Sequence, residues 1–229
     1  MKTTSLIYFL PFILISSCSN SQSKNQVSVF ENILGKENYN TLSLLTSDFE
    51  KDILKKTYPA LSTEKAYEKF LIDVKERKVV FWNKISSKNR KTFQKSDLRL
   101  EIYEFPDSVW IGKNGIESRY VFNNDDGTIY RNDDGTIHYG FSSKSADINK
   151  NPDSLIVNEY NTPRLKYSGK YIEAIRTIKD GNNFLEAFYD VKDKAGYIHS
   201  EVMAEILLKN EPDFSNDIIK KLIVMEFGY

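Results

Sequence analysis

Cys18, His138 and His199 are the rarest reactive side chains of this sequence, which has one cysteine and two histidines. Thiols act as nucleophiles and as metal ligands, and zinc is usually held by ligands drawn from cysteine, histidine and carboxylates. A zinc site would need both histidines together with carboxylates, and the sequence contains no H-E-x-x-H motif. We therefore expect both histidines to be surface or packing residues, and we predict no metal or other cofactor.

The cysteine follows a short apolar segment near the start of the chain. Lys2 supplies a positive charge, and the run from Leu6 to Ile15 is apolar. A membrane-spanning helix needs about 20 apolar residues, so this run is too short to span and instead suits an export signal. The segment Ile15-Ser16-Ser17-Cys18 resembles the lipobox of bacterial lipoprotein signal peptides, in which an aliphatic residue and two small residues precede the cysteine.

This resemblance implies a lipid anchor on Cys18. In that class the thiol takes a diacylglycerol group, a signal peptidase removes the preceding residues (here 1–17), and the new amino group receives a further acyl chain such as palmitate. Each buried CH₂ group contributes about 0.8 kcal/mol, so two or three chains on one residue hold a protein on a membrane permanently. The alternatives are an ordinary secretory signal with Cys18 as a bystander, and an uncleaved anchor.

The residues after the cysteine bear on location. Residues 18–26 are polar and predict a flexible tether, which leaves a single folded domain over residues 27–229. An Asp directly after the cysteine often marks inner-membrane retention in the lipoprotein class, and this chain has Ser19 there. By resemblance, we expect an exported protein, anchored to the outer membrane if the cell has one, on its periplasmic face or at the cell surface.

The charge balance argues against nucleic acid as a partner. Lys+Arg and Asp+Glu each number 32, so the formal net charge is zero, whereas affinity for nucleic acid depends on an excess of basic residues. The predicted partners are therefore membrane lipid, contacted through the acylated Cys18, and an envelope protein. The basic segment 84–95 could bind phosphate or anionic lipid, although such runs are more often solvated.

Two acidic repeats raise the question of calcium. The sequence N-D-D-G-T-I occurs at 124–129 and again at 132–137. Counting back from each glycine places Phe122 or Tyr130 where an EF-hand needs its first Asp, so neither repeat is an EF-hand. Each repeat suits a tight turn before a short strand. We expect plain turns; the alternative is a calcium site of another type, built from Asp125, Asp126, Asp133 and Asp134.

Two further patterns have both a chemical and a structural interpretation. The segment Ser62-Thr63-Glu64-Lys65 has the S-x-x-K spacing of penicillin-binding serine nucleophiles, but no K-T-G companion exists. Ser62 also precedes a helical apolar stripe, so we expect it to be a helix cap. Trp82 and Trp110 could line a glycan or apolar ligand site, and the alternative is packing in the core and in the sheet.

The element pattern predicts an α+β fold, with N-terminal helices, a central antiparallel β meander and C-terminal helices. Helical stripes run to about residue 77, and Asn114-Gly115 predicts a hairpin between strands 108–111 and 116–122. The second group of helices begins near residue 170, and the segment 222–227 could be either a helix or a closing strand. We also predict strands at 98–102 and 155–157 and a loop at 142–154.

No G-x-S-x-G motif, Walker loop or G-x-G-x-x-G motif occurs in the chain. Together with the lipobox, this favours a non-enzymatic envelope lipoprotein that binds a ligand or a protein partner, and we predict no catalytic residues. Two alternatives remain open. One is an envelope hydrolase that uses Asp/Glu pairs brought together by the fold, and the other is an immunity- or inhibitor-type lipoprotein.

Overall fold

A computed structural model describes the backbone of residues 16–78, 86–113, 115–123, 128–147, 151–166, 168–195 and 198–229, and the side chains from residue 25 onward within these ranges. Residues 1–15 and the side chain of Cys18 lie outside the described part, so the lipobox and the lipidation of Cys18 stay predictions. Nearly all of the segment 78–82, including Trp82, lies outside it as well.

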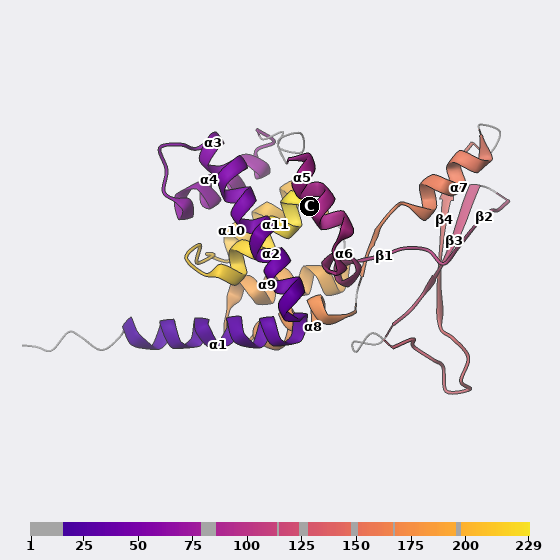
Figure 1. The fold of residues 1–229 in the computed structure, drawn as a ribbon, viewed down its shortest axis with the longest axis horizontal. Helices are drawn as coiled ribbons and strands as arrows, with labels where there is room; N and C mark the ends of the chain where they lie inside the picture. The colour runs from indigo at the N-terminus through magenta and orange to yellow at the C-terminus, as the bar shows by residue number, and fades with distance from the viewer. Residues whose placement is uncertain are drawn as a thin grey trace, which may run out of the picture.

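The chain forms a body of helices from which a small sheet projects (Figure 1). The part that we call the helical body contains α1 Ser16–Leu34, α2 Lys36–Phe49, the π-helical turn η1 Glu50–Leu54, α3 Lys55–Thr57, α4 Thr63–Lys75, α5 Ser87–Lys95, α6 Asp97–Ile102, α8 Lys170–Ile178, α9 Asn183–Ala195, α10 Ser200–Lys209 and α11 Asp217–Gly228. The part that we call the β lobe contains β2 Ser108–Ile111, β3 Gly115–Val121, β4 Tyr139–Ser145 and α7 Pro152–Tyr160. Two short paired strands, β1 Tyr103–Glu104 and β5 Arg164–Leu165, join the parts. The α+β prediction is confirmed.

The end of α1 and the start of α4 lie where the sequence predicts, whereas α1 and α2 begin earlier than predicted. α1 stops at Gly35, whose φ of 88° lies in the left-handed region that glycine tolerates. The apolar stripe of α2 continues through the π-helical turn, so that Phe49 and Ile53 are both buried. The side chain of Ser62 accepts a hydrogen bond from the backbone N–H of Lys65, so the cap interpretation of the S-x-x-K segment is confirmed.

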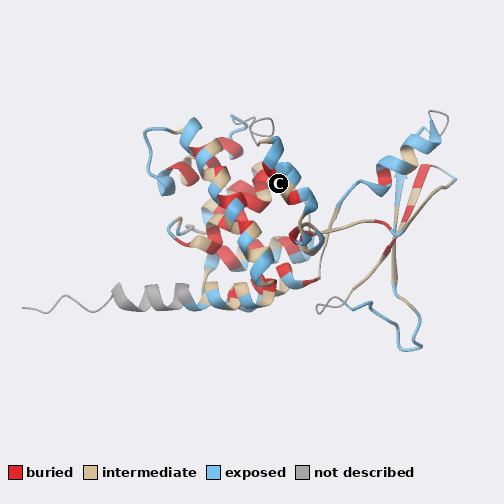
Figure 2. Cartoon of the chain, viewed as in Figure 1, coloured by how far each residue is buried: buried red, intermediate tan, exposed pale blue. Residues whose placement is uncertain are grey.

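The hydrophobic core lies in the helical body, and α11 passes through its centre. Figure 2 shows that buried residues concentrate in the helices and are sparse in the β lobe. The buried members of the core cluster come from α1, α2, η1, α4 to α6 and α8 to α11, including Phe30, Phe70, Phe184 and Phe227. The segment 222–227 is helical and is buried on nearly every side. A helix that is apolar all round is one enclosed by other helices, and this settles the choice between helix and strand.

The β lobe confirms the hairpin and the second acidic turn. β2 and β3 pair antiparallel, with Ile111 opposite Ile116, and β4 pairs with β3 on the other side. The turn at 132–135 closes with a hydrogen bond from Gly135 N–H to the carbonyl of Asn132 (2.8 Å), and Gly135 has a φ of 81°. The turn of the first repeat, 124–127, lies outside the described residues. The repeats contribute isolated bridges rather than strands, and β4 is the third strand.

The prediction of a strand at 98–102 is wrong. These residues form α6, with Leu98 and Ile102 buried four residues apart and Leu100 exposed between them. Three apolar residues at i, i+2 and i+4 fit a strand and one turn of helix equally well over so short a stretch. The burial pattern fits the helix, which brings residues i and i+4 to the core and turns i+2 outward, whereas a strand would place all three on one face.

The region 142–157 also differs from the prediction. β4 continues to Ser145, so the predicted loop begins too early, and the predicted strand at 155–157 lies inside α7. Asn151 caps α7 by accepting a hydrogen bond from Ser154 N–H (3.1 Å), and Pro152 is its first residue. Asn followed by Pro is a helix-start signal that outweighs three adjacent aliphatic residues.

The segment predicted as a flexible tether is helical in the structure. The backbone of residues 18–26 lies within α1, and the amide of Gln26 donates a hydrogen bond to the carbonyl of Ile178 at 3.0 Å. Among the residues whose side chains the structure describes, Val27 is the first that packs against the core. None of the helices in the described part of the chain combines the length and the hydropathy that crossing a bilayer requires.

Candidate functional site

A cavity of about 490 Å³ lies between the helical body and the base of the β lobe. We call it the inter-lobe cavity. One wall, the helix side, comes from α8, α9, α10 and α11. The other wall, the strand side, comes from β1, β3, β4, β5 and the residues that flank β5. Small-molecule sites typically occupy about 300–1,000 Å³ and favour the junction between two structural units.

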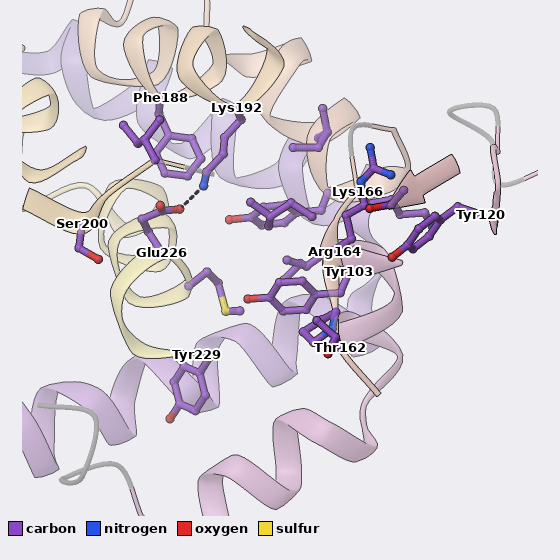
Figure 3. A pocket seen from close by; sticks show the side chains of 18 of the residues that line it. Tyr103, Tyr120, Thr162, Arg164, Lys166, Phe188, Lys192, Ser200, Glu226 and Tyr229 are labelled. Carbon is purple, nitrogen blue, oxygen red and sulfur yellow. Dashed lines mark ion pairs between the residues drawn. The ribbon is translucent and has the colours of Figure 1, made fainter. Parts of the chain in front are cut away.

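Most of the cavity wall is apolar or aromatic. Phe188 and Met225 line the helix side and are buried, and Tyr103 lines the strand side with its hydroxyl directed across the cavity (Figure 3). Ile172 and Ile198 add aliphatic surface. Such a wall removes apolar ligand surface from water at roughly 25 cal/mol per Å². The arrangement therefore suits the apolar part of a small molecule.

A buried ion pair stands in the helix side. Lys192 Nζ on α9 lies 2.5 Å from Glu226 Oε2 on α11, and the two side chains are 8% and 11% exposed. Burial raises the pKa of Glu226, and the charge of Lys192 and its hydrogen bond oppose that shift. The pair places one cation and one anion side by side, so it adds polarity to this wall without net charge.

Three phenols along the cavity stay protonated at neutral pH. Burial raises the pKa of Tyr103 and of Tyr229 to about 12. The pKa of Tyr171 is raised further, first by burial and then by the charge of Glu226 and the neighbouring Tyr103. The hydroxyl of Tyr171 is buried and has no hydrogen-bond partner among the described residues. A buried donor without a partner costs about 1–3 kcal/mol, which makes this part of the wall receptive to a hydrogen-bond acceptor.

The strand side carries cations. Lys144 on β4, Arg164 on β5 and Lys166 just after it all line the cavity. The guanidinium of Arg164 also lies over the ring of Tyr120, 5.0 Å from its centroid. Among the described residues that line the cavity, Glu226 is the only carboxylate. A pair of carboxylates about 5–10 Å apart, as a glycosidase-type hydrolase needs, is therefore not formed by the lining residues that the structure describes.

The histidines and acidic turns do not converge on the cavity. His138 lies in the β lobe, where its Nδ1 is 3.0 Å from Asn132 Oδ1, and His199 is the exposed residue before α10. Asp134 accepts hydrogen bonds from Thr136, as expected for a plain turn, whereas Asp125 and Asp126 lie outside the described residues. Within the described ranges, no group of three or more His, Cys, Asp or Glu side chains could hold a metal ion.

The remaining candidates from the sequence are the basic segment and Trp110. In the basic segment, Lys88, Lys91 and Lys95 lie on the exposed face of α5, whereas Phe93 on the opposite face is buried. Trp110 belongs to β2, where its indole N–H donates to Glu117 at 2.8 Å. Its ring meets Phe141 edge-on, so the described tryptophan packs within the sheet.

The sequence did not identify the residues of the inter-lobe cavity, although two of them left a signal. Glu226 interrupts the apolar run 222–227, and Lys192 occupies a stripe position four residues after Phe188. A charged residue at a buried position of a helix is rarely tolerated without a partner. The sequence shows that these two charged residues stand at apolar positions, but it does not show that α9 and α11 bring them together.

Comparisons of this chain with protein-family models, with curated proteins and with solved structures found no match.

Proposed function

We propose that this chain is a lipid-anchored envelope protein that binds a small, mostly apolar molecule in the inter-lobe cavity. The anchor is the acylated Cys18 that the lipobox resemblance implies. The observation that carries the binding role is the cavity itself, with its apolar and aromatic wall and few polar groups. This is the pattern of small-molecule binding sites.

The choice of a binding role over hydrolysis is supported by the charges of the wall. Glu226 is the one acidic side chain among the described lining residues, and Lys192 holds it at 2.5 Å. A carboxylate so engaged is neither a free general base nor one of two facing acids. The polar groups that remain on the wall, the phenols and the strand-side cations, are groups that orient a ligand.

Binding can be tested with an uncharged fluorescent probe, N-phenylnaphthylamine, whose emission rises in an apolar site. The protein is the mature-length chain, residues 18–229, with Cys18→Ser to leave it unlipidated. Among its described side chains, the first that packs on the core is Val27, so this form keeps the described body intact. Tyr229 lines the cavity, so an affinity tag belongs at the N-terminal end.

A matched pair of substitutions locates the probe. Ile198 lines the cavity, whereas Val202, four residues on, is 49% exposed and does not line it. Ile198→Trp should fill part of the cavity and weaken probe binding by about tenfold, and Val202→Trp should leave it unchanged. Equal affinity of both variants and the parent, or no probe binding at all, would refute the proposed site.

The anchor has its own test in cells. Cys18→Ser in the full chain should prevent acylation and leave an unprocessed precursor, because the thiol is the group that takes the lipid. Metabolic labelling with a palmitate analogue and fractionation of membranes measure both effects, with Ser19→Ala as the control. Normal processing and membrane association of the Cys18→Ser protein would show that the lipobox interpretation is wrong.

A further inference from the structure

The charges around the inter-lobe cavity are unevenly distributed. Figure 3 shows Glu226 and Lys192 on one side of the view and Arg164 and Lys166 on the other. On the helix side the ion pair is closed at 2.5 Å and is neutral as a unit. On the strand side, the described lining residues include cations and no carboxylate.

The strand-side cations are only partly neutralised by carboxylates. Arg164 Nε lies 3.6 Å from Glu104 Oε1, which is longer than a hydrogen bond, and that carboxylate oxygen is buried without a hydrogen-bond partner in the described part of the chain. Burial also raises the pKa of Glu104, although Arg164 and Lys166 oppose this shift. Glu104 is therefore a weak partner for the guanidinium.

The two lysines differ in how they are compensated. Lys166 Nζ donates to the carbonyl of Leu100 at 3.1 Å, and a carbonyl is an acceptor that does not cancel a positive charge. Lys144 Nζ, in contrast, lies 2.7 Å from Glu159 in an ordinary ion pair. Lys144 is thus paired with a carboxylate, whereas Arg164 and Lys166 form no hydrogen bond with a carboxylate of the described residues. Glu101, which lies beside Lys166 at Gly169, accepts a hydrogen bond from the backbone N–H of Lys170.

We propose, on the basis of the function proposed above, that the cavity takes an amphiphile with one anionic head group, a carboxylate or a phosphate. The head group lies at the strand side, where the guanidinium of Arg164 and the ammonium of Lys166 contact it. Arg and Lys are the side chains that pair with such oxyanions. The apolar part lies against Tyr103, Phe188 and Met225.

The helix side fixes this orientation. An anionic head group placed there would meet the carboxylate of Glu226, and a cationic one would have to displace Lys192 from a buried pair. A cation would have to separate a buried ion pair, and an anion would be repelled by Glu226 unless it also separated that pair, so both arrangements are unfavourable. The same argument excludes a cationic amphiphile as the favoured ligand.

The experiment compares four amphiphiles of equal chain length: decanoate, decyl phosphate, decanol and decyltrimethylammonium. Each displaces N-phenylnaphthylamine from the mature-length chain, and the displacement curve gives its affinity. We expect decanoate or decyl phosphate to bind about tenfold more tightly than decanol, and the cation to bind most weakly. The better of the two anions identifies the head group.

Variants locate the head group. Arg164→Gln and Lys166→Gln should each weaken binding of the preferred anion by about five- to tenfold and leave decanol unchanged. The control is Lys209→Gln, an exposed lysine of α10 paired with Glu205 outside the cavity. Two positions are used because Arg164 also packs on Tyr120, and circular dichroism checks the fold of each variant.

The outcomes separate this inference from the function on which it rests. Equal binding of decanol and the anions, or tightest binding of decyltrimethylammonium, would overturn the anionic head group while probe binding still supports the cavity. Unchanged anion affinity in both folded variants would overturn the placement at Arg164 and Lys166. Absence of probe binding, with no effect of Ile198→Trp, would remove the proposed function itself.

Discussion

At the scale of single residues, Lys192 and Glu226 form an ion pair inside the helical body, where each neutralises the charge of the other. Lys192 and Glu226 contact each other across α9 and α11, and the Lys192 ammonium also lies 5.7 Å from the centroid of the Phe188 ring. Removing two ions from water costs several kcal/mol each, and mutual attraction offsets this cost only while both partners remain. Loss of either side chain should therefore lower the stability of the protein.

Lys192→Met should lower the free energy of unfolding by about 3–5 kcal/mol, because it leaves the carboxylate of Glu226 buried without its cation. Denaturation in urea measures this loss. Lys194→Met is the control, since Lys194 on the same helix is 69% exposed and pairs with Asp190. The double variant Lys192→Met, Glu226→Leu should regain most of the stability. A single variant as stable as the parent would contradict this account.

Asp107 offers a pH-dependent test in the β lobe. Arg119 Nη2 and Nε donate to its Oδ2 at 2.6 and 3.1 Å, and these bonds lower the pKa of Asp107. Asp107→Asn should therefore cost about 0.5–1 kcal/mol at pH 7. A lowered pKa in the folded state gives stability that is complete above the unfolded pKa of about 3.9 and is lost as the pH falls through the folded value.

The measurement is urea denaturation of parent and Asp107→Asn protein between pH 7 and pH 3. The difference between them should be constant down to about pH 4 and should close below it. Asp133→Asn, in an exposed turn of the same lobe, should stay within about 0.5 kcal/mol of the parent throughout. A gap that closes well above pH 4 would contradict the assigned pair.

At the scale of elements, α11 depends on Asn216, the residue that caps its N-terminus. Asn216 is 7% exposed and accepts a hydrogen bond from Ile218 N–H at 2.9 Å. Asn216→Ala should destabilise the protein by about 1–2 kcal/mol, because the helix then begins with an unsatisfied donor in a buried place. Asn40→Ala, on the exposed face of α2, should be neutral or slightly stabilising. Thermal unfolding of both variants makes the comparison.

The elements also show what could be predicted from the sequence. α4 and α9 have 13 residues each, which is more than three turns, and an apolar stripe in a helix of that length admits one interpretation. α6 has six residues and α7 has nine, so their few apolar residues fit strand and helix alike. Their form is decided by contacts with distant segments, and a local pattern does not contain those contacts.

The candidate site was hidden for the same reason. Tyr103, Arg164, Lys192 and Glu226 come from four separate parts of the chain, and no pair of them is close in sequence. The Cys18 prediction rests instead on four adjacent residues and needs no fold. Local motifs can thus predict a modification site, whereas a cavity formed by packing needs the tertiary structure.

At the scale of the whole molecule, the β lobe is inserted between α6 and α8 of the helical body and is joined to it by two short strands. β1 and β5 lie side by side, with Glu104 opposite Arg164, and the lobe leaves and re-enters the helical body through them. Replacing residues 105–163 by a short Gly/Ser linker should therefore leave a helical body that unfolds cooperatively, since the buried core cluster includes no residue of the lobe. Circular dichroism and calorimetry test this expectation.

The protein without the β lobe should also lose the part of the cavity wall that Tyr120 and Lys144 provide. Probe binding should fall although the fold remains, which separates the two parts by role. A chain that aggregates or melts without a cooperative transition would show that the helical body needs the lobe. Val202→Trp in the full chain remains the control for probe binding.

The position of α11 has a consequence for how the protein is made. Nine of its twelve residues are buried, and in the chain they follow every other helix of the helical body. Until they are synthesised, the apolar side chains of α2 that pack on α11 stay exposed to water, so the core is incomplete although the other helices can already pack on one another. A premature stop codon at the start of α11 would correspondingly remove nine buried residues from the core, rather than trim an exposed end.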